Sequence, residues 1–174
     1  MTTAGATPQG TWAPKVVGLV CDWAVATSTI ADGDGRLRAH PSVVLIRVPC
    51  SGFIRPSWLE DMLKAGADGV FVVGCPYGDC LNREGNYLMR ERVDQLRRRL
   101  QRRKVDPARL GMLAHGLHDE TAFMADVGVF LDRLRELGPA AVPRAAAPAR
   151  PAASATPGGA AATPQAVPAE DGGA

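Results

Sequence analysis

The chain has 174 residues, is 46% hydrophobic and carries a formal net charge of +2 at pH 7. This length and apolar content suit one domain with its own core, and the near-neutral charge gives no general sign of nucleic-acid or anionic-membrane binding. The first residues show no charged start followed by an apolar stretch, and no segment has the length needed to cross a bilayer. We therefore expect a cytoplasmic protein that binds neither nucleic acid nor a membrane.

The order of predicted elements indicates the fold class. Four short β-branched or aliphatic runs are typical of buried strands, at 16–20, 43–48, 69–73 and 110–114. Helical patterns occupy 57–65, 86–104 and 120–137. The segment 24–40 is rich in Asp, Gly and Thr and indicates a short helix or a loop. Because strands and helices alternate, we expect an α/β fold with an open parallel sheet of about four strands and flanking helices.

The two ends of the chain differ in composition from its middle. From residue 139 onward Ala, Pro, Gly and Thr predominate, and such a composition cannot bury enough apolar surface to offset chain entropy. We expect a flexible N-terminus over 1–14, an α/β domain over 15–138 and a disordered Ala/Pro-rich tail over 139–174.

The four cysteines fall where the predicted strands end. Cys21, Cys50 and Cys75 each follow one of the first three predicted strands, and Cys80 belongs to the same loop as Cys75. Without a secretion signal such thiols more often bind metal or take part in redox chemistry than form disulfides. Because the carboxyl ends of neighbouring parallel strands open on one crevice, we expect the four thiols to meet there.

The residues around the cysteines favour an iron-sulfur centre. The four-residue spacing between Cys75 and Cys80 also occurs in plant-type ferredoxin loops. Gly74 and Gly78 let the backbone pass close to a bulky inorganic core and turn its amides toward sulfur. Cys50 is likewise followed by small residues whose amides would stabilise added negative charge.

Three other interpretations of the cysteines remain open. Cysteines near strand ends are often just small buried apolar groups. A structural zinc site would use the same four thiols, although zinc sites usually contain C-x2-C pairs and Ala24 stands where a second cysteine would follow Cys21. A thiol redox sensor would form a reversible disulfide between Cys75 and Cys80.

Several further residues carry weaker expectations. The three histidines, His40, His115 and His118, are expected on the surface or at a partner contact. Trp23 either shields the site from water or packs beneath the sheet edge. Asn86 is expected to be the N-cap of its helix, and the alternative is that Gly85-Asn86-Tyr87 places a backbone amide or a phenol near the site or a partner.

A cationic run closes the second long helix, at residues 97–104. It is typical of a solvated face supported by the helix dipole, and docking onto an acidic partner is the alternative. The shortage of aromatic neighbours argues against single-stranded nucleic acid.

A set of short motifs resembles a known family. The motifs are Cys21-Asp22-Trp23, Arg47-Val48-Pro49-Cys50-Ser51-Gly52, Gly66-Ala67-Asp68-Gly69-Val70, Gly74-Cys75, Gly78-Asp79-Cys80 and Gly85-Asn86-Tyr87. Through them residues 15–138 resemble the delta subunit of methyl-viologen-reducing hydrogenase, which is also found beside heterodisulfide reductase and formate dehydrogenase modules. The resemblance implies a Rossmann-like domain and a non-catalytic subunit of an oxidoreductase complex. It also implies a [2Fe-2S] cluster that relays electrons from a hydrogenase or formate dehydrogenase module to a heterodisulfide-reductase-like flavin subunit.

Two departures from the family pattern bear on this implication. The family has Cys-Asn-Trp-Cys at the end of the first strand, where this chain has Ala24 in place of the second cysteine, and its usual His-Pro is Pro76-Tyr77 here. A [2Fe-2S] core needs four protein ligands, and four cysteines remain. We therefore expect the ligands to be Cys21, Cys50, Cys75 and Cys80.

Overall fold

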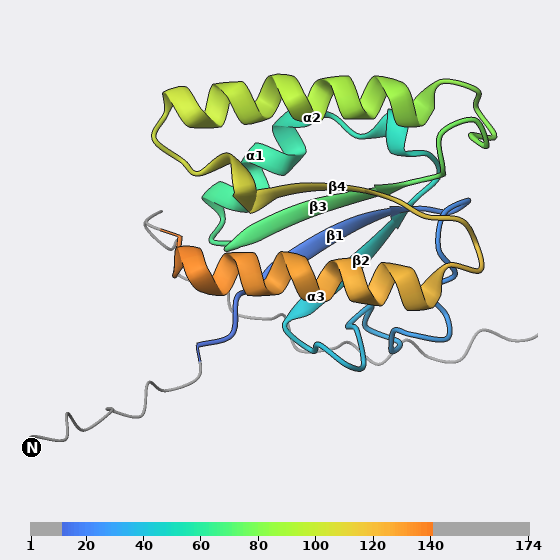
Figure 1. Cartoon of the computed structure of the whole chain (residues 1–174), viewed down its shortest axis with the longest axis horizontal. Coiled ribbons are helices and arrows are strands. Elements are labelled where there is room, and N and C mark those ends of the chain that lie inside the picture. Colours follow the sequence, from blue (N-terminus) through green and yellow to red (C-terminus); the bar gives the residue numbers. More distant parts are fainter. Residues whose placement is uncertain (1–11, 141–174) are drawn as a thin grey trace, which may run out of the picture.

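Figure 1 shows a computed structural model of the chain, which describes residues 12–140. Its elements are β1 (Val16–Cys21), β2 (Val43–Val48), a 3-10 turn (Ser51–Phe53), α1 (Pro56–Lys64), β3 (Gly69–Gly74), α2 (Gly85–Arg102), a second 3-10 turn (Pro107–Arg109), β4 (Leu110–Ala114) and α3 (Glu120–Leu137). Most of the predicted flexible N-terminus and of the predicted disordered tail, 1–11 and 141–174, lies outside the described residues. The domain boundaries at 15 and 138 stay a prediction.

The four strands form one parallel sheet in the order β2-β1-β3-β4, which confirms the predicted fold class. Helices α1 and α2 cover one face and α3 covers the other (Figure 1). β3 lies inside the sheet and all six of its residues are buried, whereas edge strand β2 exposes Ile46 and Arg47. Within residues 12–140, no helix has both the length and the apolarity to cross a membrane.

The structure moves several predicted boundaries by one or two residues. Cys21 is the last residue of β1 rather than the residue after it. Segment 24–40 is a loop held by two isolated antiparallel bridges, Ala31 to Leu37 and Arg36 to Val44. Because the buried residues of this loop pack on the α3 side of the sheet, it covers part of the face that α3 leaves open.

Part of the cationic end of α2 is used within the domain. Arg99 and Arg103 contact the carboxylate of Glu60 on α1, at 2.8 and 3.0 Å, and Lys64 lies 3.8 Å from it. Glu60 is buried, so these charges stabilise it where water cannot. Arg99 and Arg103 are exposed despite these contacts, as are Arg98, Arg102 and Lys104, so the run forms the predicted solvated face and also pairs with Glu60.

The Glu60 cluster predicts a dependence of stability on pH. Burial by itself raises the pKa of Glu60, but the hydrogen bond from Arg99 and the charges of Arg103, Arg99 and Lys64 outweigh it and hold the pKa below the usual 4.5. A carboxyl group whose pKa is lower in the folded state stabilises the fold above its unfolded pKa. That stabilisation is lost as the pH falls through the lowered value.

We expect Glu60→Gln to remove this part of the acid sensitivity. Urea unfolding of the wild type and the variant, at pH 7 and at a series of pH values below 4.5, measures how the free energy of unfolding of each depends on pH. Asp61→Asn is the matched control, because Asp61 is an exposed carboxylate on the same helix that pairs only with Lys64 among the ion pairs of the described chain. An unchanged difference in stability between pH 7 and acid in Glu60→Gln would contradict the prediction.

Candidate functional site

The first pair of thiols lies where the direction of strand order reverses. β1 is followed in sequence by β2 on one side of it, and β3 pairs on its other side, so a crevice opens beyond the ends of β1 and β3. Cys21 ends β1 and Cys75 directly follows β3. Their sulfur atoms are 3.8 Å apart and both residues are buried. Two of the predicted site residues therefore meet as expected.

The second pair lies at the start of α2. The sulfur of Cys50 is 2.6 Å, and that of Cys80 3.4 Å, from the position that a Cβ on Gly85 would take. Both residues are half-buried. The absence of a side chain at Gly85 leaves room for the two sulfurs, so Cys50 and Cys80 share one small space.

The two pairs are electrostatically connected through Cys75. Burial, followed by the charge and hydrogen bond of Cys21 and the charge of Cys80, raises the pKa of the Cys75 thiol to about 12, against the opposing effect of a hydrogen bond from the Leu81 backbone. A buried thiol with this pKa keeps its proton at neutral pH. A bound cation would displace that proton, because metal ligands must be deprotonated.

The loop carrying Cys75 and Cys80 is braced by α2. The Asp79 amide donates a hydrogen bond to the Pro76 carbonyl and closes a turn in this loop. Within the turn, Gly78 has a φ of +97°, a conformation that favours glycine. Asn86 is fully buried and donates to the carbonyls of Cys75 and Pro76, at 3.1 and 2.9 Å.

The predicted N-cap role of Asn86 is therefore wrong. The N-cap residue is Glu84, and α2 begins at Gly85. The Asn86 amide holds the cysteine loop instead, because burial of its side chain beside two free carbonyls outweighs the capping preference. A fully buried Asn could not be distinguished from a cap by its position near the helix start.

Trp23, Ala24 and His118 differ in how far they are buried. Trp23 is 50% exposed, and its carbonyl accepts a hydrogen bond from the Cys75 thiol at 3.5 Å. Ala24 is fully buried in the same core cluster as Cys21 and Cys75. His118 is exposed as expected.

The prediction that His115 lies on the surface is wrong. It is 6% exposed, its Nε2 lies 3.0 Å from Asp126, and its backbone amide bonds to the Gly74 carbonyl. The register of β4 beside β3 carries His115 into the packed edge of the sheet, next to Phe123. A histidine just beyond a strand gives no sequence signal of this pairing partner.

The donor set fits an iron-sulfur cluster. Two sulfurs that bind one metal tetrahedrally at about 2.3 Å lie about 3.8 Å apart, which is the spacing of Cys21 and Cys75. Across residues 12–140, no three His, Cys, Asp or Glu side chains are grouped closely enough to hold a single metal ion. The thiols are thus arranged as two pairs, and soft thiolates of this kind are the ligands that iron-sulfur clusters use.

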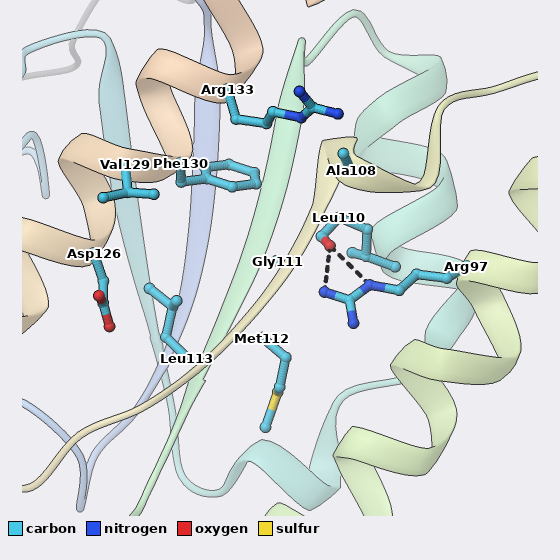
Figure 2. A pocket seen from close by; sticks show the side chains of 10 residues that line it. All are labelled: Arg97, Ala108, Leu110, Gly111, Met112, Leu113, Asp126, Val129, Phe130 and Arg133. Atoms are coloured by element: carbon cyan, nitrogen blue, oxygen red, sulfur yellow. Dashed lines mark hydrogen bonds between the residues drawn. The ribbon is translucent and has the colours of Figure 1, made fainter.

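Two surface hollows lie away from the thiols. Figure 2 shows one of about 330 Å³ beside β4, between Arg97 of α2 and Val129, Phe130 and Arg133 of α3. The Arg97 guanidinium donates to the Leu110 carbonyl there, at 2.8 and 3.1 Å. A second hollow, of about 380 Å³, lies beside the loop 27–38. Neither is lined by a cysteine, so neither places a substrate against the thiols.

Exposed apolar side chains gather at the same end of the sheet as the thiols. Of the nine large apolar residues exposed within residues 12–140, seven lie in the loops beyond the strand ends or in the first turn of α2. We call these seven the apolar collar: Trp23, Phe53, Tyr77, Leu81, Tyr87, Leu88 and Leu117. The rings of Tyr77 and Tyr87 pack at a tilt with centres 5.0 Å apart, and Arg90 lies over Tyr77. Exposed apolar side chains gathered at one end of a domain are a candidate protein contact surface.

Comparison with known proteins gives a consistent set of relatives. The family model for the delta subunit of methyl-viologen-reducing hydrogenase matches residues 16–138. The iron-sulfur subunit of the F420-non-reducing hydrogenase vhc of Methanococcus voltae is 35% identical over 128 residues, which are 74% of this chain and 89% of the relative. The corresponding iron-sulfur subunit of the F420-non-reducing hydrogenase of Archaeoglobus profundus is 34% identical over 128 residues, 74% of this chain and 93% of the relative.

A further relative has the same domain within a larger chain. This relative is one subunit of the ferredoxin/F(420)H(2)-dependent CoB-CoM heterodisulfide reductase of Methanosarcina acetivorans, and it is 31% identical over 134 residues. The match covers 77% of this chain but only 17% of the relative. In that protein the domain is joined covalently to the rest of a heterodisulfide reductase chain.

Proposed function

The chain belongs to the family of methyl-viologen-reducing hydrogenase delta subunits, and from this we propose that Cys21, Cys50, Cys75 and Cys80 hold one [2Fe-2S] cluster that passes electrons. The observation that carries the proposal is the arrangement of the thiols as two pairs at one edge of the sheet. The cluster would supply one-electron chemistry, and the chain supplies the thiolates, the amides and the apolar surroundings that set its potential.

The paired arrangement favours a two-iron cluster over zinc. A structural zinc ion takes four ligands on one tetrahedron, and no three candidate ligands of the described chain are grouped for one ion. A [2Fe-2S] cluster takes its four cysteines over two irons. The thiol sensor, with a disulfide between Cys75 and Cys80, gains less support, because the sulfur within 3.8 Å of Cys75 is that of Cys21.

The partners we propose follow from the relatives. Two are named as hydrogenase iron-sulfur subunits and one as part of a heterodisulfide reductase. We propose that the chain works in the cytoplasm within a hetero-oligomeric complex. There it carries electrons between a hydrogenase or formate dehydrogenase module and a heterodisulfide-reductase-like flavin subunit, without a reaction of its own.

A reconstitution tests this relay. The chain is combined anaerobically with the hydrogenase and flavin subunits of its source organism, and flavin reduction by hydrogen is followed by absorbance. We expect reduction with the wild type and none with Cys75→Ser or without the chain. The same rate of flavin reduction with and without the chain would contradict the proposal.

The apolar collar predicts the docking surface for the flavin subunit. We expect Phe53→Ser combined with Leu81→Ser to weaken this association at least about tenfold, because truncated apolar anchors at the centre of an interface often cost about 2 kcal/mol or more. Val129→Ser is the matched control, since Val129 is 70% exposed but lies on α3 away from the thiols. Isothermal titration with the purified flavin subunit measures the affinities, and equal weakening by the control would contradict the assignment.

A further inference from the structure

We infer that the first turn of α2 is one wall of the cluster site: Gly85 must lack a side chain to admit the sulfurs of Cys50 and Cys80, and the amide end of the helix stabilises their negative charge. This inference rests on the proposed function, because it assigns residues toward the proposed cluster. It adds the first turn of α2 to the strand ends and loops that carry the four cysteines.

The contacts of Gly85 explain its lack of a side chain. A Cβ at this position would lie 2.6 Å from the Cys50 sulfur and 3.4 Å from the Cys80 sulfur. The backbone of Gly85 is not in the left-handed region that favours glycine, where the described glycines are Gly35, Gly66, Gly78 and Gly138. Close approach to sulfur, rather than backbone conformation, is therefore what requires glycine here.

A second glycine brings another backbone amide to the same space. A Cβ on Gly52 would lie 2.9 Å from the Cα of Gly85, so the two backbones pack directly on each other. The Gly52 nitrogen lies 3.5 Å from the Cβ position of Gly85, which is also where the two sulfurs approach. Arg92 of α2 holds this contact by donating to the carbonyls of Gly52 and Ile54, at 2.7 and 3.2 Å.

The electrostatics of the helix end point the same way. α2 is 18 residues long, its N-cap residue Glu84 makes no side-chain capping bond, and its first turn contains no acidic residue. The amino end of a helix carries a partial positive charge that stabilises anions close to it. The Tyr87 amide donates to the Asn86 side-chain oxygen at 2.8 Å. Because the first turn has no carboxylate, the partial charge of its remaining amides acts on the nearby sulfurs of Cys50 and Cys80.

The consequence is a separate role for each cysteine pair. Cys21 and Cys75 are buried on the α3 side of the sheet, in the cluster of apolar residues there. Cys50 and Cys80 are half-buried, and Cys80 packs against the margin of the same apolar cluster. The sulfurs of both approach Gly85 at the positive end of α2. Added negative charge is therefore better stabilised on the α2 side, and a helix end displaced from the sulfurs lowers the reduction potential.

The first test is a double-mutant cycle in the full chain without metal. In the chain that keeps Cys50, we expect Gly85→Ala to lower the urea midpoint of unfolding. In a Cys50→Ala background, where the clashing sulfur is gone, we expect Gly85→Ala to leave the midpoint unchanged or to raise it. If Gly85→Ala alone fails to fold, the cycle still tests the contact, because the variant with both substitutions is expected to fold. An equal shift of the midpoint by Gly85→Ala in both backgrounds would overturn the contact.

The second test measures the cluster itself. Gly85→Ala is compared with Gly128→Ala, a matched helical glycine of α3 whose Cβ would meet nothing within 4 Å. We expect Gly128→Ala to keep the wild-type iron content and midpoint potential, and Gly85→Ala to lose iron or to shift the potential to a more negative value. Identical iron content and potential in the two variants overturn the inference, whereas a wild type without iron or sulfide overturns the proposed function instead.

Discussion

Replacing Cys75 by serine is expected to reduce bound iron and acid-labile sulfide to about a tenth of the wild-type content or less. Cys75 is 2% exposed and faces Cys21 at 3.8 Å, so a lost sulfur has no substitute within reach. A serine hydroxyl is a hard, weakly acidic ligand and a poor replacement for a soft thiolate. Colorimetric iron and sulfide assays on anaerobically purified protein measure the content per chain.

A buried histidine at the same sheet edge provides the control. His115→Asn removes the contact with Asp126 and lowers stability, yet we expect it to keep the iron content because His115 is not among the ligands. Cys21→Ser should behave like Cys75→Ser. A full iron and sulfide content in Cys21→Ser would refute the proposed ligand set.

Removing the ring of Phe71 is expected to cost about 3–5 kcal/mol of unfolding free energy. Phe71 is fully buried on β3, and its ring makes edge-to-face contacts with Phe123 and Phe130 of α3, with centroids 6.2 and 5.7 Å apart. Phe71→Ala therefore leaves a cavity where the sheet and α3 meet. Urea unfolding of the metal-free chain measures the loss, with similar slopes indicating a common unfolded state.

The comparison variant is Phe53→Ala. Phe53 is 63% exposed and packs edge-on against Trp58, so we expect a change of about 1 kcal/mol or less. A cost for Phe71→Ala as small as that for Phe53→Ala would mean that α3 is not held to the sheet by this cluster.

The strands and the sheet were predictable because their signal is local. Runs such as 69–73 are apolar throughout, which is typical of a strand buried on both faces, and alternation with helices implies parallel pairing. The family resemblance was equally accessible, because its motifs are short and contiguous, and the matching family model and relatives confirm it.

The details of the site depend on strand order, which no local pattern contains. The placement of β1 between β2 and β3 decides that Cys21 faces Cys75, while Cys50 and Cys80 meet at Gly85. The burial of Asn86 likewise arises from contacts between segments distant in sequence. The position of Asn86 near the helix start therefore suggested an N-cap, whereas its side chain braces the cysteine loop.

Metal analysis of the anaerobically purified full chain tests the central claim most directly. Iron, zinc and acid-labile sulfide are counted per chain, and the reduced protein is measured by electron paramagnetic resonance. The account predicts about two irons and two sulfides per chain, negligible zinc, and a signal from one unpaired electron after reduction. Colourless protein with about one zinc per chain and no sulfide would contradict it.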